Sequence, residues 1–327
     1  DTKNSEAKDA TIKSAGRESG ILTPGKQIGK VVIIGAYGNT GITAKCEVTI
    51  RRELKITTGD TLLVAKDGTE QITTSWDNSE LTFTSEDKTI ADVGQNTGLV
   101  TGKKAGITKV TVTTPDGQSK VVTVTVGQIT LSGQNILEQE KTTDIVATIA
   151  PQTLSNYRIK WESNKTNIAT VDNNGTVKGI SPGTATITAK ILNKSGVETG
   201  IQATCTVTVV GNLEIKASDM IIAKNEKNVQ IPYTYDGDAS DITWSSSSNI
   251  ATVSNGTVSG GASAGTTIVT AKNKLNGKNA TIRVIVGEIT LSGESNVEVD
   301  STTLINKTIK PTEIENNKVK WVSSNPS

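Results

Sequence analysis

The chain is 327 residues long, which exceeds the size of one ordinary domain and predicts several. Its 34 Lys and Arg residues balance 33 Asp and Glu residues, so the charge argues against a nucleic-acid partner or an anionic membrane. Histidine, the side chain most used for proton transfer near neutrality and for metal binding, is absent, which argues against an enzyme.

The residue types predict an all-β chain. Thr, Val, Ile, Ser, Asn and Gly, which favour strands and tight turns, are abundant, whereas Met and Phe each occur once. No run of about 18 apolar residues is present to span a membrane as a helix. The first residues lack the basic and apolar segments of an export signal, so any such signal is expected outside this sequence.

One pattern recurs along the chain, and its fullest copy is IKWESNKTNIATVDNNGTVKGISPGTATITA at residues 159–189. It consists of an aromatic strand, the sequence IATV, an Asn-Gly turn, a short strand, a PG or AG corner and an alternating strand. The aromatic residues of successive copies lie about 80 residues apart, which is the length of a domain rather than of a solenoid repeat. These aromatic residues are Phe83, Trp161, Trp244 and Trp321.

The copies divide the chain into five segments. In order, these are the C-terminal half of a unit (1–50), three complete units (51–126, 127–210 and 211–286) and the N-terminal half of a further unit (287–327). GQITLSG at Gly127 recurs as GEITLSG at Gly287, so two types of unit alternate. The simplest interpretation is a window from a longer array. The alternative is that each half-unit completes that of a neighbouring copy by strand addition.

Within each unit, the alternation of side chains predicts a β-sandwich. Short strands with a period of two, separated by clusters of turn residues, are typical of that fold. The residues predicted to face inward include Val122, Val124, Val126, Ala185, Ile187 and Ala189. Asn174-Gly175 and Asn255-Gly256 are expected to supply the positive φ angles that primed hairpin turns need, and the turn glycines are expected to fix the strand register. These glycines are Gly98, Gly175 and Gly256.

The aromatic residues and both cysteines are expected in the sandwich cores. Each aromatic is the largest apolar group in a unit poor in aromatics, so it is expected between the two sheets. TGITAKCEVTI around Cys46 aligns with TGIQATCTVTV around Cys205, and the other copies have Val122 or Ile282 at that position. An aliphatic core site therefore explains the cysteines better than a disulfide or a reactive thiol.

The run W-x-S-x-x-x-x-I-A-T-V-x-x-x-G-x-V-x-G-x-x-x-G-x-A-x-I-T-A resembles the group 2 bacterial immunoglobulin-like domain. The resemblance covers the three complete units in full and the two half-units in part. It implies tandem immunoglobulin-like Greek-key β-sandwiches arranged as a rod. Family members are similar in being modules of bacterial surface proteins, adhesins, cell-wall-associated enzymes and phage virion proteins, without shared catalytic residues. Phe83 replaces the pattern's Trp and keeps an aromatic group.

Other candidate sites have simpler explanations. Asp236, Asp238 and Asp241 could gather around Ca²⁺, but their spacing fits no EF-type loop, and an acidic surface turn explains them better. Scattered lysines without interleaved aromatic residues favour solvated strand edges over a nucleic-acid surface. A Ser-His-Asp arrangement is excluded because the chain contains no histidine.

The sequence therefore favours a non-enzymatic structural and adhesive segment of a bacterial extracellular or cell-surface protein, without a cofactor. The expected partner is protein, through self-association or a host or cell-surface protein, with a glycan as a further alternative. Two other hypotheses are a phage virion fibre or decoration protein and a carbohydrate-binding accessory array of a secreted hydrolase. The last would show exposed aromatic side chains on one face, and the chain has few aromatic residues.

Overall fold

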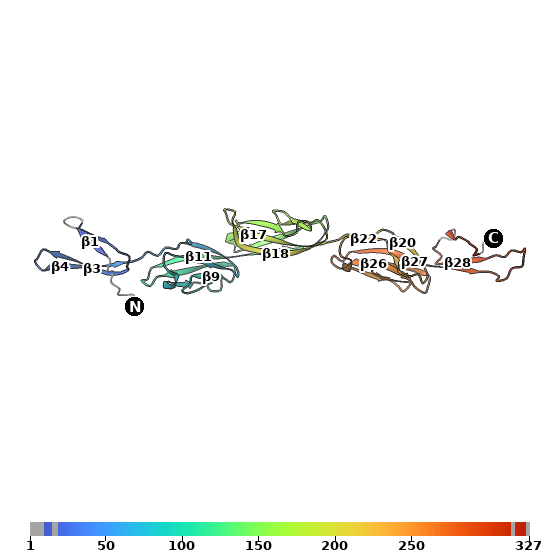
Figure 1. The fold of residues 1–327 in the computed structure, drawn as a ribbon, viewed down its shortest axis with the longest axis horizontal. Coiled ribbons are helices and arrows are strands. Elements are labelled where there is room, and N and C mark those ends of the chain that lie inside the picture. Colours follow the sequence, from blue (N-terminus) through green and yellow to red (C-terminus); the bar gives the residue numbers. More distant parts are fainter. Residues whose placement is uncertain (1–9, 15–18, 315–317, 325–327) are drawn as a thin grey trace. The chain divides into compact units, whose positions relative to one another are not determined.

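The computed structural model describes residues 10–14, 19–314 and 318–324, which consist of strands, turns and short 3-10 helices (Figure 1). The predicted all-β class is therefore confirmed. The 3-10 helices are η2 (Asn78–Glu80), η3 (Gln152–Leu154) and η4 (Ala239–Asp241).

Contacts divide the chain into two compact units. The first comprises Asp1–Leu131, Ala147–Lys160 and Ala189–Ala203, and the second comprises Ser132–Val146, Trp161–Thr188 and Thr204–Ser327. The division passes through strands of the 127–210 segment rather than between the expected segments. The five-segment division proposed from the sequence therefore stays a prediction.

The first unit contains two two-stranded sheets, β1 with β2 and β3 with β4, followed by two larger layers. One layer has the order β5-β11-β10-β7 and the other β6-β9-β8. The strands are β1 (Thr11–Ser14), β2 (Gly20–Thr23), β3 (Gly29–Tyr37), β4 (Ile42–Ile50), β5 (Thr61–Ala65), β6 (Thr69–Gln71), β7 (Thr82–Ser85), β8 (Ala91–Val93), β9 (Leu99–Gly102), β10 (Gly106–Thr113) and β11 (Ser119–Gly133).

The middle of the chain repeats this arrangement. One of its sheets has the order β12-β18-β17-β14, and β15-β16-β13 belongs to a seven-stranded sheet that continues through β11 and β10 to β7. The strands are β12 (Ile136–Glu138), β13 (Thr142–Ala150), β14 (Arg158–Ser163), β15 (Ala169–Val171), β16 (Thr176–Gly179), β17 (Gly183–Leu192) and β18 (Glu198–Val210).

The second unit ends with a third copy, whose layers have the orders β20-β27-β26-β23 and β21-β25-β24. Beside them, β19 pairs with β22, and β28 pairs with the last residues of β27. The strands are β19 (Leu213–Ile215), β20 (Asp219–Ala223), β21 (Val229–Gln230), β22 (Tyr233–Tyr235), β23 (Ile242–Ser246), β24 (Ala251–Ser254), β25 (Thr257–Gly260), β26 (Gly265–Asn273), β27 (Asn279–Ser292) and β28 (Asn306–Lys310).

The three copies share one strand topology, which is a stronger repeat signal than their sequences. In each copy, the short first strand runs parallel to the long last strand: β5 with β11, β12 with β18, and β20 with β27. In the first and third copies the other pairs of the four-stranded layer are antiparallel, so these two layers are mixed sheets. Two such layers enclosing an apolar interior form a β-sandwich.

The cores follow from the alternation in the sequence. Val122, Val124 and Val126 are fully buried along β11, and the intervening threonines are partly exposed. The same holds for Ala185, Ile187 and Ala189 along β17, where each is at most 2% exposed. The predicted inward residues are therefore confirmed. Apolar burial of this kind contributes about 25 cal/mol for each Å² removed from water.

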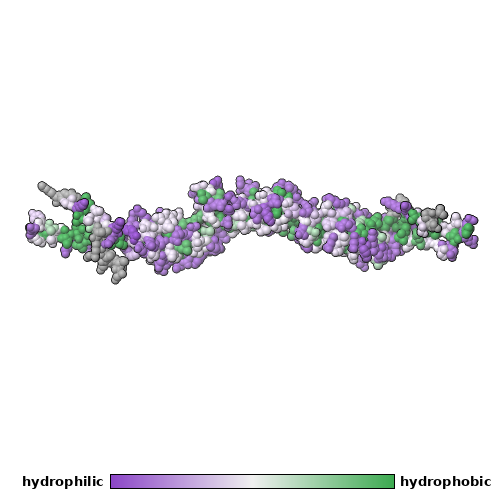
Figure 2. Space-filling view, in the orientation of Figure 1, coloured by the Kyte–Doolittle hydropathy of each residue, from purple (hydrophilic) through white to green (hydrophobic). Residues whose placement is uncertain are grey.

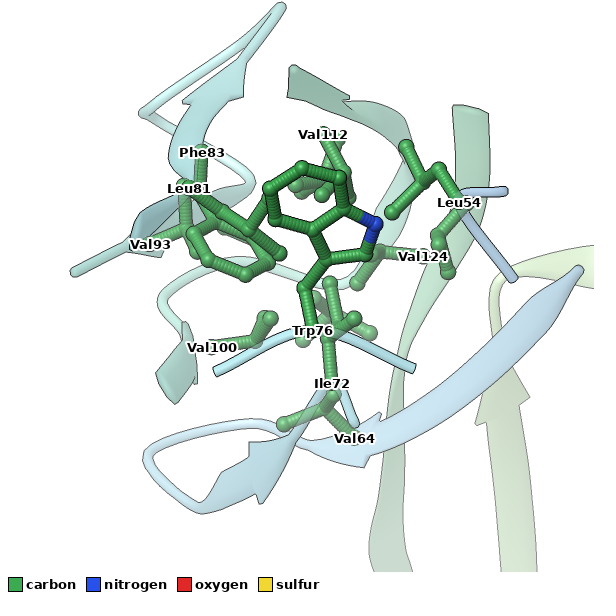
Figure 3. Close-up of a cluster of buried hydrophobic side chains, with 14 residues drawn as sticks. Leu54, Val64, Ile72, Trp76, Leu81, Phe83, Val93, Val100, Val112 and Val124 are labelled. Carbon is green, nitrogen blue, oxygen red and sulfur yellow. The ribbon is translucent and has the colours of Figure 1, made fainter. Parts of the chain in front are cut away.

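Trp76 lies in the core of the first complete sandwich, surrounded by aliphatic side chains and Phe83 (Figure 3). Leu81, Phe83 and Val93 lie on one side of its indole ring, and Leu54 and Val124 lie near its nitrogen. A second cluster, which includes Ile222, Ile231, Val269, Val284 and Val286, fills the third sandwich.

Candidate functional site

The residues singled out from the sequence mostly hold the sandwiches together. Phe83 on β7 is 2% exposed and belongs to the core cluster around Trp76. Gly98, in the turn before β9, has a φ of +69°, and a Cβ built on it would lie 2.8 Å from two carbon atoms of the Phe83 ring. Gly98 is therefore required for its backbone conformation and for its closeness to the ring.

The same glycine-aromatic contact recurs in the other two copies. A Cβ on Gly175 would lie 2.7 Å from the ring of Trp161, and one on Gly256 would lie 2.5 Å from the ring of Tyr233. Tyr233 in turn meets Trp244 edge to face, with ring centroids 5.0 Å apart and an interplanar angle of 70°. In the third copy, Tyr233 therefore lies between the turn glycine and the tryptophan.

The turns are of different kinds. Asn255 and Gly256 both have positive φ, +46° and +80°, as the predicted primed hairpin turn requires. Within residues 172–176 only Gly175 has a positive φ, so the prediction of a primed hairpin turn at this position is wrong. That turn is longer, and the Asp172 carboxylate stabilises it by accepting the backbone N–H groups two and four residues further on, at 2.8 and 2.9 Å.

Cys46 and Trp321 are not buried, so the prediction that both cysteines and all the pattern's aromatic residues lie in sandwich cores is wrong for these two residues. Cys46 is exposed, and Trp321 is 52% exposed, whereas Cys205 and Trp161 are partly buried. Among the described residues, β3 and β4 form a two-stranded sheet and β28 pairs only with β27, so no second sheet covers Cys46 or Trp321. Burial raises the pKa of the Cys205 thiol, as expected for a partly covered position.

Each of the three aspartates of the candidate calcium loop accepts a hydrogen bond from a nearby group. Asp236 accepts the backbone N–H of Asn212 at 2.6 Å, and Asp238 caps η4 by accepting the N–H of Ser240 at 2.9 Å. These hydrogen bonds hold the pKa of Asp238 below its ordinary value. Asp241 accepts the Tyr235 hydroxyl at 3.4 Å. In the part of the chain that the structure describes, no group of three or more His, Cys, Asp or Glu is arranged to hold a metal ion.

Trp76 is the core residue that the sequence did not reveal. It is 6% exposed, and the Arg52 guanidinium lies 4.0 Å from the centroid of its ring, a cation-π contact. Its indole N–H has no hydrogen-bond partner among the residues that the structure describes. Trp76 lies in the non-periodic segment ITTSWDN, but the replacement of the usual Trp by Phe83 in this unit was a signal that a second aromatic could complete the core.

Two exposed apolar surfaces are the best candidates for binding. The first lies on the β3–β4 hairpin, where Tyr37 is 73% and Ile42 65% exposed. The second lies on residues 289–305 and 321–322, where Val297 is 49% and Trp321 52% exposed. Figure 2 shows hydrophobic residues gathered over both segments, in contrast to the mostly hydrophilic surface of the complete sandwiches. Contiguous exposed apolar surface is typical of protein interaction sites.

No helix in the described residues is long and apolar enough to cross a membrane. Cross-strand ion pairs lie on the outer faces, among them Arg283 with Asp219 at 2.8 Å and Lys160 with Glu198 at 3.1 Å. Exposed pairs of this kind contribute about 0 to 1 kcal/mol each.

The strand order and the mixed parallel and antiparallel pairing define the copies as immunoglobulin-like β-sandwiches. Residues 55–126 and 125–207 each match the bacterial Ig-like domain (group 2) family, so these two segments are domains of this family and the resemblance inferred from the sequence is confirmed there.

Three curated proteins share segments with this chain. A 3-O-α-D-galactosyl-α-L-arabinofuranosidase of Bifidobacterium longum subsp. longum is 31% identical over 83 residues, 25% of this chain and 7% of that protein. A κ-carrageenase of Pseudoalteromonas carrageenovora is 35% identical over 85 residues, 25% of this chain and 21% of that protein. An uncharacterised protein of Clostridium acetobutylicum is 29% identical over 132 residues, 36% of this chain and 12% of that protein. The chain thus spans only a small part of each relative.

Solved structures that resemble parts of this chain include invasin, a bacterial integrin-binding protein, at 16% identity and a TM-score of 0.33, covering 85% of this chain and 69% of that chain. A C-terminal fragment of intimin in complex with the intimin-binding domain of the translocated intimin receptor has 18% identity and a TM-score of 0.34, covering 52% of this chain and 68% of that chain.

Proposed function

We propose that this chain is a non-enzymatic structural and adhesive segment of a bacterial extracellular or cell-surface protein. In this role, tandem immunoglobulin-like domains act as a stalk or as a self-associating filament or layer. The observation that carries the proposal is the triple repeat of one sandwich, in which the distinctive residues serve packing. Phe83, Trp161 and Tyr233 each cover a turn glycine.

Charge and chemistry support the same proposal. The chain has no histidine, and its near-zero net charge offers no field for nucleic acid. The expected partner is protein, because the exposed apolar surfaces on β3–β4 and on residues 289–305 and 321–322 are the kind that protein interfaces cover. Exposed threonine-rich strand faces suit a module that remains in water outside the cell.

Localisation on producing cells tests this proposal. Antibodies raised against residues 51–286 are expected to label the outside of intact cells or their extracellular material, and deletion of the segment is expected to weaken attachment or surface assembly. Exclusive labelling of the interior after permeabilisation would contradict the proposed role.

A second candidate function is an accessory module of a secreted glycan hydrolase. It is favoured by one observation, the short shared segments in the arabinofuranosidase and the carrageenase. Affinity electrophoresis of residues 51–286 through gels containing arabinogalactan or κ-carrageenan separates the two candidates. A structural segment is expected to migrate as it does without polysaccharide, whereas retardation would favour the accessory module.

A further inference from the structure

Two turns of the chain carry the same four residues, Asn-Gly-Thr-Val. One begins at Asn174, in the connection from β15 to β16, and the other begins at Asn255, between β24 and β25. Both asparagines are exposed, and both glycines are buried. A glycine after an asparagine leaves the asparagine side chain room to react with the backbone, because glycine has no side chain to obstruct the approach. Since the local sequences match, the structure of each turn decides how the two sites differ.

The reaction open to such a pair converts the asparagine side chain to a carboxyl group. The glycine nitrogen, after giving its proton to hydroxide, attacks the side-chain carbon Cγ of the asparagine. The bond from Cγ to Nδ2 breaks, and the nitrogen leaves as ammonia with a proton from water, so that a five-membered cyclic imide remains. Water then opens the imide at either carbonyl and gives aspartate or isoaspartate. In the net reaction, water is consumed and ammonia is released.

The turn at Asn174 restrains the attacking nitrogen. The N–H of Gly175 donates to the carbonyl oxygen of Asp172 at 3.2 Å. The Asp172 carboxylate also accepts the N–H groups of Asn174 and Thr176, at 2.8 and 2.9 Å. Because the glycine nitrogen must lose its proton before it attacks, a hydrogen bond from that N–H slows the reaction.

The turn at Asn255 leaves the equivalent nitrogen without a hydrogen bond. The antiparallel pairing of Ser254 with Thr257 closes this turn, and the Thr257 hydroxyl donates to the Ser254 carbonyl at 2.9 Å. Within the described part of the chain, neither the N–H of Gly256 nor the side chain of Asn255 has a hydrogen-bond partner. Both reacting groups are therefore unrestrained here.

The third Asn-Gly pair of the sequence, Asn276 with Gly277, is restrained at both groups. The N–H of Gly277 donates to the carbonyl oxygen of Asn273 at 2.9 Å. The side-chain oxygen Oδ1 of Asn276 accepts the N–H of Lys278 at 3.0 Å. Asn255 is thus distinguished from the other two asparagines by its hydrogen bonds and not by its sequence.

We propose that Asn255 is a site of spontaneous modification, at which the Gly256 nitrogen attacks Cγ of Asn255 and the third sandwich acquires aspartate or isoaspartate with age. The inference goes beyond the proposed function, since it holds whatever partner the chain binds.

Isoaspartate at position 255 would disturb the packing of the third sandwich. It lengthens the turn backbone by a CH₂ group, next to a glycine whose Cβ would already lie 2.5 Å from the Tyr233 ring. Tyr233 in turn contacts Trp244, with ring centroids 5.0 Å apart. A longer turn therefore displaces Gly256 or the Tyr233 ring.

Peptide mapping by mass spectrometry tests the proposal on the full 327-residue chain, incubated for weeks at mildly alkaline pH. Modification at each site is read from a mass increase of about 1 Da. Asn255 is expected to react at least about fivefold faster than Asn174 or Asn276, because each of those glycine N–H groups must first break a hydrogen bond. Equal rates in the folded chain, or a faster reaction at Asn174 or Asn276, would overturn the proposal.

The unfolded chain is the matched control. In guanidinium chloride, Asn255 and Asn174 are expected to react at the same rate, because both are followed by Gly-Thr-Val. A difference that persists there in the same proportion would show that the turns do not set the rates, and it would also overturn the proposal.

Asp172→Ala removes the carboxylate that stabilises the first turn. It is expected to raise the rate at Asn174 and to leave the rate at Asn255 unchanged. Hydrogen exchange of β17 and β18 checks that the variant is folded. An unchanged rate at Asn174 in the folded variant would contradict the idea that these turn hydrogen bonds protect the site.

Hydrogen exchange of the separated products tests the effect on packing. Amides of β24 and β25 are expected to exchange at least about tenfold faster in the isoaspartate form than in the unmodified chain, because the lengthened turn crowds the Tyr233 ring. Asn255→Asp adds the same charge without lengthening the backbone and is expected to exchange as the unmodified chain does. Equal exchange in the isoaspartate form and in Asn255→Asp would overturn this effect.

Discussion

Replacing Gly98 with alanine is expected to destabilise the sandwich of residues 51–126 by about 2 to 5 kcal/mol, and replacing Gly117 by about 1 to 2 kcal/mol. Both glycines have left-handed backbone conformations, with φ of +69° and +86°. A Cβ costs about 1 to 2 kcal/mol in that region. At Gly98 the Cβ would also lie 2.8 Å from the Phe83 ring, whereas at Gly117 nothing lies within 4 Å. Forcing atoms into a packed core adds about 1 to 3 kcal/mol.

Hydrogen–deuterium exchange of the full chain measures this difference locally. Amides of β10 and β11 report on the affected sandwich, and those of β26 and β27 serve as an internal control. Because about 1.4 kcal/mol corresponds to a tenfold change in an equilibrium constant, Gly98→Ala is expected to lower the protection of β10 well beyond the effect of Gly117→Ala. Equal losses for the two variants would refute the idea that Gly98 is needed beneath the ring.

Three further predictions follow from the described contacts. Phe83→Ala is expected to cost about 3 to 5 kcal/mol in chemical unfolding, whereas Leu99→Ala, at a 42% exposed position of the same sandwich, is expected to cost under about 0.5 kcal/mol. Hydrogen bonds from backbone N–H groups hold the pKa of Asp172 below its ordinary value, so they stabilise its turn above about pH 4. That stabilisation is expected to be lost as the pH falls through the folded pKa, and carbon NMR titration of the carboxyl checks this. Cys46 is expected to be alkylated faster than Cys205, because Cys46 is exposed and burial raises the pKa of the Cys205 thiol.

The sequence predicted the sandwich cores because alternation has a direct physical meaning in strands. Val122, Val124 and Val126 face inward because successive side chains of a strand point to opposite sides. The turn glycines were also found from the sequence, since L-residues rarely adopt positive φ. Why they lie beneath aromatic rings could not be predicted, because that closeness arises between segments distant in sequence.

The degree of aromatic burial could not be read from the sequence. Trp161 and Trp244 lie on β14 and β23, the edge strands of their sheets, so one side of each ring stays open and both are only partly buried. In the first sandwich, Phe83 also lies on an edge strand, but Trp76 packs into the same cluster and Phe83 is buried. Sheet order and loop position, rather than residue type, determine which aromatic is covered.

The central claim is that the chain consists of consecutive, independently folded immunoglobulin-like sandwiches, and force spectroscopy of residues 51–286 tests it most directly. The account predicts three unfolding events of similar size, each releasing about 25 nm of chain at roughly 3.3 to 3.6 Å per residue. Two larger events, or a single one, would contradict it and would show that the chain unfolds by a division other than its sequence repeats.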